Sequence, residues 1–143
     1  MIAFDAHANF IAVLVDTPPS PATTGTAVVV TAGGGALFPS VPFNVTVFPG
    51  DANPSSSNAE IVRVTGITSD TLTITREQES TSARTIVAGD RLVLTITSKT
   101  LTDIEDAIED GLAVECPDNS ISYKWVPRLS NDGETIVGEW QAV

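Results

Sequence analysis

The chain has few of the residues that build metal sites, disulfides or nucleophilic catalytic centres. Its 143 residues include one cysteine, Cys116, and one histidine, His7. A single thiol forms no disulfide within the chain, and a zinc site needs three or four His, Cys or carboxylate ligands in a closed shell. Cys116 precedes Pro117 and lies far along the chain from His7, the natural general base for a thiol, so we interpret it as a packing residue. The sequence therefore predicts no cofactor and no enzyme.

Basic residues and long apolar runs are also scarce. Seven Lys and Arg residues against eighteen Asp and Glu residues give a formal charge of −11. This charge repels phosphate backbones and anionic membrane surfaces, so we expect no nucleic-acid partner and no membrane partner. No apolar run approaches the length of a membrane span, and the start of the chain lacks the basic residues of a signal peptide and carries Asp5 early. We expect the protein to be made in a cytoplasm.

What the chain does contain is abundant Thr, Ser, Ala and Val, which favours strands and polar loops. We predict a mainly β fold, either an antiparallel β-sandwich or a barrel-like meander, with one short amphipathic helix and a C-terminal hairpin. The expected organisation is an N-terminal arm over residues 1–9 and a β domain over residues 10–98. Residues 99–143 are expected to form the helix and the C-terminal hairpin, packed on the same domain.

The stretch from Ala59 to Thr97 is the predicted centre of the fold. It has two alternating segments separated by a Thr-Ser-Asp turn, followed by a third segment, and we interpret it as a hairpin and a further strand. The alternation predicts four core residues: Val62, Val64, Leu72 and Ile74. The threonines of the second strand, together with Arg63 and Arg76, are expected to form a solvated or packed polar surface.

Two local patterns could indicate ligand sites, and each has a simpler explanation. The triplet Gly33-Gly34-Gly35 resembles a phosphate loop, but no Lys-Ser/Thr pair follows it, so a turn between β elements is the better interpretation. Glu105 and Glu109 lie at i,i+4 and could flank a hard cation. Because calcium ligands come from loops spaced around glycine, a solvated helix face explains these carboxylates better.

One helix is predicted over about residues 100–112. Thr102 and Glu105 fit a capping box at its start, and Gly111 marks its end. An apolar stripe at helical spacing contains Leu101, Ile104, Ile108 and Leu112. The stripe has two interpretations: it packs on the sheet, or it meets copies of itself around a symmetry axis as part of a larger interface.

The two ends of the chain contain the remaining interface candidates. Phe10 lies at the junction of the arm and the first strand, and the C-terminal hairpin contains Tyr123, Trp125 and Trp140. These aromatic residues could stack on sugar rings, anchor a protein partner or fill the core beneath the sheet. Tyr123 and Trp125 alternate in the manner of inward-facing residues, which leaves Trp140 as the better interface candidate.

Most of the chain, from Phe10 to Glu105, resembles a module of tailed-phage structural proteins. The words that carry the resemblance are Pro-Ser-Pro-Ala-Thr-Thr-Gly-Thr (19–26), Gly-Ala-Leu-Phe-Pro (35–39), Pro-Phe-Asn (42–44), Asn-Ala-Glu-Ile-Val-Arg-Val-Thr (58–65), Asp-Thr-Leu-Thr-Ile-Thr-Arg-Glu-Gln-Glu (70–79), Ala-Arg-Thr-Ile-Val-Ala-Gly-Asp (83–90) and Lys-Thr-Leu-Thr-Asp-Ile-Glu (99–105). Similar modules occur at the start of head and tail fibre proteins and in small virion proteins. The family implies no catalytic residues.

The resemblance implies a structural protein on the virion surface, made in the host cytoplasm. Fibre proteins continue into long shafts, and this sequence has a single aromatic hairpin after the module. We therefore expect a capsid decoration protein that acts as a homotrimer and binds the major capsid protein. The alternative is a tail fibre or tail adaptor protein that binds another tail protein or a host surface glycan.

Overall fold

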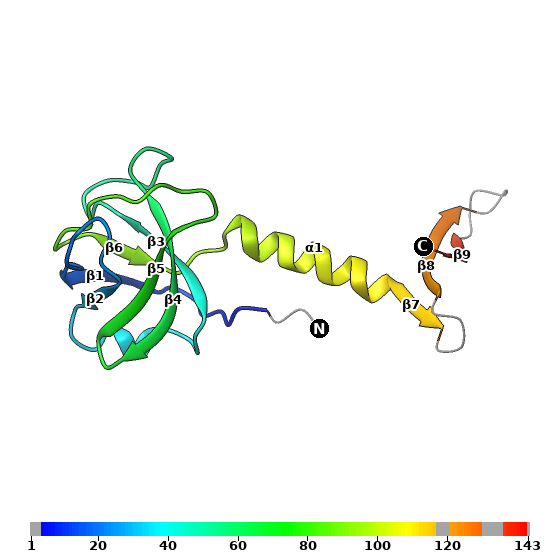
Figure 1. Cartoon of the computed structure of the whole chain (residues 1–143), viewed down its shortest axis with the longest axis horizontal. Coiled ribbons are helices and arrows are strands. Elements are labelled where there is room, and N and C mark those ends of the chain that lie inside the picture. Colours follow the sequence, from blue (N-terminus) through cyan, green and yellow to red (C-terminus); the bar gives the residue numbers. More distant parts are fainter. Residues whose placement is uncertain (1–3, 117–120, 130–135, 143) are drawn as a thin grey trace. The chain divides into compact units, whose positions relative to one another are not determined.

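The computed structural model describes residues 4–116, 121–129 and 136–142 (Figure 1). The chain divides into two compact units, of which the first spans residues 3–100 and the second contains residues 101–143. Each unit is described by itself.

The first unit is a ring of six antiparallel strands (Figure 1). The strands are β1 (Ala12–Thr17), β2 (Ala27–Val30), β3 (Phe43–Phe48), β4 (Glu60–Thr68), β5 (Thr71–Gln78) and β6 (Arg91–Val93), with a short 3-10 helix, η1 (Gly35–Leu37), after β2. Their order in the sheet is β1-β2-β5-β4-β3-β6, and β6 also pairs with β1, so the hydrogen-bond ladder closes on itself. The predicted mainly β, antiparallel class is confirmed.

The core lies inside this ring because alternate residues of each strand face inward. All four predicted core residues, Val62, Val64, Leu72 and Ile74, are buried. The other buried members of the same cluster are Ile11, Val13, Val15, Val28, Val30, Phe38, Phe43, Val45, Val47, Ile86 and Leu92. Alternation of apolar and polar residues was therefore sufficient to find the core of the central hairpin.

The third segment of the predicted meander forms β6, which does not pair with β5 as a meander would require. β3, β4 and β5 follow one another, but β6 pairs with β1 and β3 instead of β5. Leu92 lies opposite Val13 on one side and Val47 on the other. β6 ends at Val93, so Ile96, which the alternation placed in the strand, lies outside it and is exposed. The short strand β6 is what closes the ring.

The second unit contains most of helix α1 (Ser98–Leu112) and a three-stranded antiparallel sheet of β7 (Ala113–Cys116), β8 (Ile121–Leu129) and β9 (Ile136–Ala142). The predicted hairpin corresponds to β8 and β9, and β7 adds a third strand that was not predicted. Pro127 lies in the half of β8 that extends beyond its pairing with β7, where the lost N–H is tolerated.

The start of α1 differs from the prediction. The helix begins at Ser98, so Thr102 and Glu105 lie within it, and the predicted capping box does not mark its first turn. The predicted end near Gly111 is close to the observed last residue, Leu112. Within the described ranges, no helix combines the length and the apolar character needed to span a bilayer.

The glycine triplet at the start of η1 binds the side-chain carboxylate of Asp70. The carboxylate of Asp70, in the turn between β4 and β5, accepts hydrogen bonds from the N–H groups of Gly33 (3.1 Å) and Gly35 (3.0 Å). Because these amides are already occupied, the interpretation of the triplet as a turn, in preference to a phosphate loop, agrees with the structure. A Cβ atom on Gly35 would lie 1.9 Å from the carbonyl oxygen of Ser69, so no side chain fits there.

This close approach predicts that Gly35→Ala lowers the free energy of unfolding by about 1–3 kcal/mol, the usual cost of overpacking a tight contact. The control is Gly66→Ala in β4, where a Cβ atom meets only the side chain of Thr73, at 3.4 Å. We expect the control to change stability by less than about 1 kcal/mol. Urea unfolding measures both variants, and equal midpoints for the two would contradict the prediction.

Candidate functional site

A buried ion pair joins β4 to β5 inside the first unit. The guanidinium of Arg76 donates two hydrogen bonds to the carboxylate of Glu60, at 2.8 and 2.6 Å. The Glu60 side chain is 0% exposed and that of Arg76 is 7% exposed. The expectation that Arg76 belongs to a polar surface of the hairpin is therefore wrong, since the side chain points into the interior toward Glu60.

This pair also binds the end of β5 and the loop that follows it. The Glu60 carboxylate accepts hydrogen bonds from the N–H groups of Glu77 (2.9 Å) and Arg84 (3.1 Å). Arg76 donates in addition to the carbonyl oxygens of Arg84 (2.6 Å) and Ala22 (3.3 Å). A second ion pair, between Arg84 and Asp90, continues the network, and Asp90 also accepts from the N–H of Val87. The loop is thus held to the barrel at Arg84, and the Arg84–Asp90 pair fixes its shape up to the start of β6.

The electrostatics of Glu60 agree with a structural role. Burial alone would raise the pKa of Glu60, but the hydrogen bonds from Arg76 and from the N–H groups of Arg84 and Glu77 outweigh it and lower the pKa below its ordinary value. The carboxylate is therefore ionised at neutral pH and both of its oxygens accept hydrogen bonds. A catalytic acid or base needs a pKa near the working pH and access to substrate, and Glu60 has neither.

We predict that Glu60→Gln lowers the free energy of unfolding by about 3–5 kcal/mol at pH 7, because it leaves the Arg76 charge buried without a counter-charge. A folded-state pKa below the ordinary value of 4.5 means that the contribution of the carboxylate is complete above that pH and is lost as the pH falls through the folded pKa. The difference between wild type and variant should therefore shrink below pH 4.5. Chemical unfolding at several pH values measures this difference.

The double variant Glu60→Leu, Arg76→Met is the control, because it removes both charges together. It should recover part of the stability that Glu60→Gln loses. A single variant as stable as wild type, or a difference that widens in acid, would contradict the structural role of the pair.

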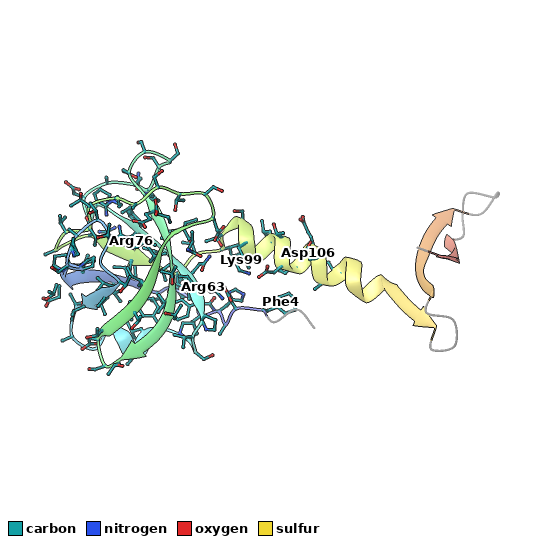
Figure 2. All side chains as sticks on the ribbon, viewed as in Figure 1. Phe4, Arg63, Arg76, Lys99 and Asp106 are labelled. Atoms are coloured by element: carbon teal, nitrogen blue, oxygen red, sulfur yellow. The ribbon has the colours of Figure 1, made fainter. Side chains whose placement is uncertain are left out.

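A second polar network connects the N-terminal segment to the start of α1. Figure 2 labels two of its residues, Arg63 in β4 and Lys99 at the start of the helix. The carboxylate of Asp5 accepts two hydrogen bonds from Arg63, at 2.9 and 2.8 Å. Arg63 also donates to the side-chain oxygen of Asn44 (3.0 Å), and the amide of Asn44 donates to Glu79 (2.7 Å). Four side chains thus form one continuous chain of hydrogen bonds, from the segment before β1 to the loop after β5.

The last member of this network, Glu79, caps helix α1. Its carboxylate accepts hydrogen bonds from the N–H of Lys99 (2.9 Å) and the hydroxyl of Ser98 (2.8 Å). An acidic group at a helix N-terminus satisfies a free N–H and interacts favourably with the helix dipole. Glu79 therefore has the role that the sequence analysis gave to Thr102 and Glu105, although it lies about twenty residues upstream.

The backbone and the pKa of Glu79 both reflect this role. Its φ is +51°, in the left-handed region that non-glycine residues rarely adopt, and the neighbouring Ser80 has φ +62°. Burial raises the pKa of Glu79, whereas the contacts with Thr97, Lys99, Asn44 and Ser98 lower it below the ordinary value. The buried Thr97 hydroxyl lies close enough to favour the ionised form, although it makes no hydrogen bond of standard geometry among the described residues.

We predict that Glu79→Ala removes the cap and lowers the free energy of unfolding by about 0.5–2 kcal/mol, the range for helix N-caps. Amide hydrogen exchange should accelerate at Lys99, whose N–H loses its acceptor. Glu77→Ala is the matched control, because Glu77 also has a left-handed φ (+57°) and its side chain contacts neither the helix nor Asn44 in any described hydrogen bond. Unchanged Lys99 exchange in the Glu79 variant, or equal acceleration in both, would contradict the capping role.

The predicted interface residues of the helix are exposed. Leu101, Ile104 and Ile108 are 55%, 42% and 58% exposed, so the apolar stripe of α1 faces solvent. Phe10, two residues before the start of β1, is fully exposed and has φ +61°. Their use as contacts stays a prediction.

The three aromatic candidates lie in the second unit. Tyr123 and Trp125 are in β8 and Trp140 is in β9, with Trp125 and Trp140 at directly paired positions. Only the backbone of these residues is described. The strand pairing brings the two tryptophans together from positions fifteen residues apart in the sequence.

The described residues contain no arrangement that would bind a metal ion. Within residues 4–116, 121–129 and 136–142, no group of three His, Cys, Asp or Glu residues is arranged to hold a metal ion. A scan against models of known protein families found no match to this chain, and a search of curated proteins found no relative. The candidate functional surfaces are the exposed apolar residues of α1 and the β7–β8–β9 sheet that contains Tyr123, Trp125 and Trp140.

Proposed function

We propose that this protein is a non-enzymatic structural protein of a phage particle, located on the virion surface, where it acts as a capsid decoration protein. In this proposal it forms a homotrimer, binds the major capsid protein and stabilises the shell. Two lines of support carry the proposal. The resemblance of residues 10–105 to phage structural modules supports the class of protein, and the exposed apolar stripe of α1 supports self-association.

The distribution of residues around α1 favours contacts between copies of the helix. With Leu101, Ile104 and Ile108 at the a, d and a positions of a heptad, the g positions hold the uncharged Thr100 and Ala107. Of the described acidic residues, Asp103 and Asp106 take the outer c and f positions, and Glu105 alone flanks the stripe. Parallel copies can therefore bring their apolar residues together while most carboxylates remain in solvent.

The first unit supports a structural role for the barrel. Its buried charges are paired, and its loop from Glu77 to Asp90 is held by several hydrogen bonds. A rigid, acidic barrel fits a protein that must stay soluble at high concentration and then occupy fixed positions on a particle.

A tail fibre or tail adaptor is the second candidate. The order of barrel, amphipathic helix and separate sheet unit favours it, because such an order suits a protein that attaches through one unit and presents the other. In this alternative the second unit binds another tail protein or a host surface glycan.

The homotrimer is tested by Leu101→Gln, Ile104→Gln and Ile108→Gln combined. Glutamine keeps helix propensity and removes the apolar stripe, so we expect the dissociation constant of the oligomer to rise roughly tenfold or more, which corresponds to about 1.4 kcal/mol. Asp106→Asn, at the outer f position, is the control on the charged face and should not weaken association. Sedimentation equilibrium measures both. A wild-type monomer at all concentrations would refute the homotrimer.

The location is tested by labelling on purified particles. A decoration protein should bind empty capsid shells in a fixed ratio and leave part of the infectivity intact when it is deleted. Presence on tails alone, with loss of adsorption on deletion, would overturn the decoration proposal in favour of the tail protein.

A further inference from the structure

The strand register of the second unit separates its residues into an apolar and a polar face. In an antiparallel pair, directly opposed residues lie on the same face of the sheet, and successive residues alternate between faces. Trp125 pairs with Trp140, and Tyr123 pairs with Val114 on one side and Ala142 on the other. The positions that share this face hold Val114, Cys116, Ile121, Tyr123, Trp125, Pro127, Leu129, Ile136, Gly138, Trp140 and Ala142. None of these residues is charged.

The opposite face has a different composition. Its positions hold Ala113, Glu115, Ser122, Lys124, Val126, Arg128, Val137, Glu139 and Gln141. Two basic and two acidic residues balance in charge there, and Lys124 is diagonal to both Glu115 and Glu139 in the register. This face suits solvent, and its neutrality contrasts with the −11 charge of the whole chain.

The apolar face needs a second layer. The apolar face of a sheet must be buried against another element, and a single three-stranded layer supplies only one side of such a core. Among the described residues, α1 makes no extensive contact with β7, β8 or β9. The face therefore requires an apolar surface from another element or from another molecule.

We propose that the apolar face of the β7–β8–β9 sheet is buried against the same face of other copies of this chain. Each copy supplies an identical apolar surface, so copies in one oligomer complete the missing layer for one another. The balanced charge of the outer face avoids repulsion between copies of an otherwise acidic protein. The sheet also follows the proposed helix interface directly in the chain, since β7 begins immediately after the last residue of α1.

The composition of the face favours a protein copy over a sugar. A glycan site combines aromatic surface with several polar groups that bind hydroxyls. The residues at the positions of this face contain few polar groups: the hydroxyl of Tyr123, the indole N–H groups of Trp125 and Trp140, and the thiol of Cys116. This inference rests on the proposed homotrimer and names the surface that would hold it together beside the helix.

The wild-type chain contains a probe for this surface. Trp125 and Trp140 are its only tryptophans, and both lie on the apolar face. Tryptophan emission and quenching by acrylamide should be measured across a dilution series of the full chain, with sedimentation on the same samples. We expect emission to shift to longer wavelength and quenching to increase over the same concentrations at which the oligomer dissociates.

Trp140→Ser and Val137→Ser are the paired variants, because both replace an apolar residue of β9 with serine, on opposite faces of the sheet. We expect Trp140→Ser to raise the dissociation constant roughly tenfold or more, as for a central aromatic contact, and Val137→Ser to leave it close to wild type. Equal effects of the two variants, or none from Trp140→Ser, would overturn the inference.

The outcomes separate this inference from the proposed function. An oligomer that dissociates with no change in tryptophan emission overturns the sheet interface and leaves the helix-based homotrimer standing. Emission typical of buried tryptophan in a monomer overturns it in favour of cover within one chain, and exposed tryptophan in the intact oligomer overturns it in favour of a different partner. A monomer at every concentration refutes both proposals.

Discussion

The buried pair of Glu60 and Arg76 is the interaction on which the closed barrel depends. It links adjacent strands at the point where β5 ends and the long connection to β6 begins. Through backbone hydrogen bonds to Glu77 and Arg84 it holds that connection against the barrel. The connection delivers β6 between β1 and β3, which closes the ring, and it also carries Glu79 to the start of α1. The Glu60–Arg76 pair therefore supports both the closure of the barrel and the cap of α1, because both depend on the connection between β5 and β6.

The polar and the apolar features of this protein have separate roles. In the first unit, Asp5 forms an ion pair with Arg63, and Asp90 forms one with Arg84. These pairs support a rigid barrel. Apolar side chains are instead exposed at Leu101, Ile104 and Ile108 of α1. An unpaired buried charge is costly, whereas exposed apolar surface is readily used for association. The proposed assembly therefore uses α1 and the second unit, whereas the buried ion pairs of the first unit contribute to stability.

Local patterns predicted the parts of the fold that depend on neighbouring residues. The alternation in the hairpin around Val62 and Leu72 predicted strands and core residues that the structure has, because period-two burial is a local property. The capping box at Thr102 failed because a helix N-terminus accepts any suitably placed carboxylate, and Glu79 reaches it from another loop. The apolar stripe of α1 and the aromatic hairpin were predicted as candidate surfaces from spacing alone.

The sequence by itself determined the β class, the core of the central hairpin, the existence of one amphipathic helix and the acidic charge. These follow from composition and periodicity, which act over a few residues. Only the tertiary structure decided that β6 closes a ring, that Arg76 turns inward to Glu60, and that Trp125 and Trp140 share one face with Val114. Each of these depends on pairing between residues far apart in the chain, where the partner is selected by register and packing.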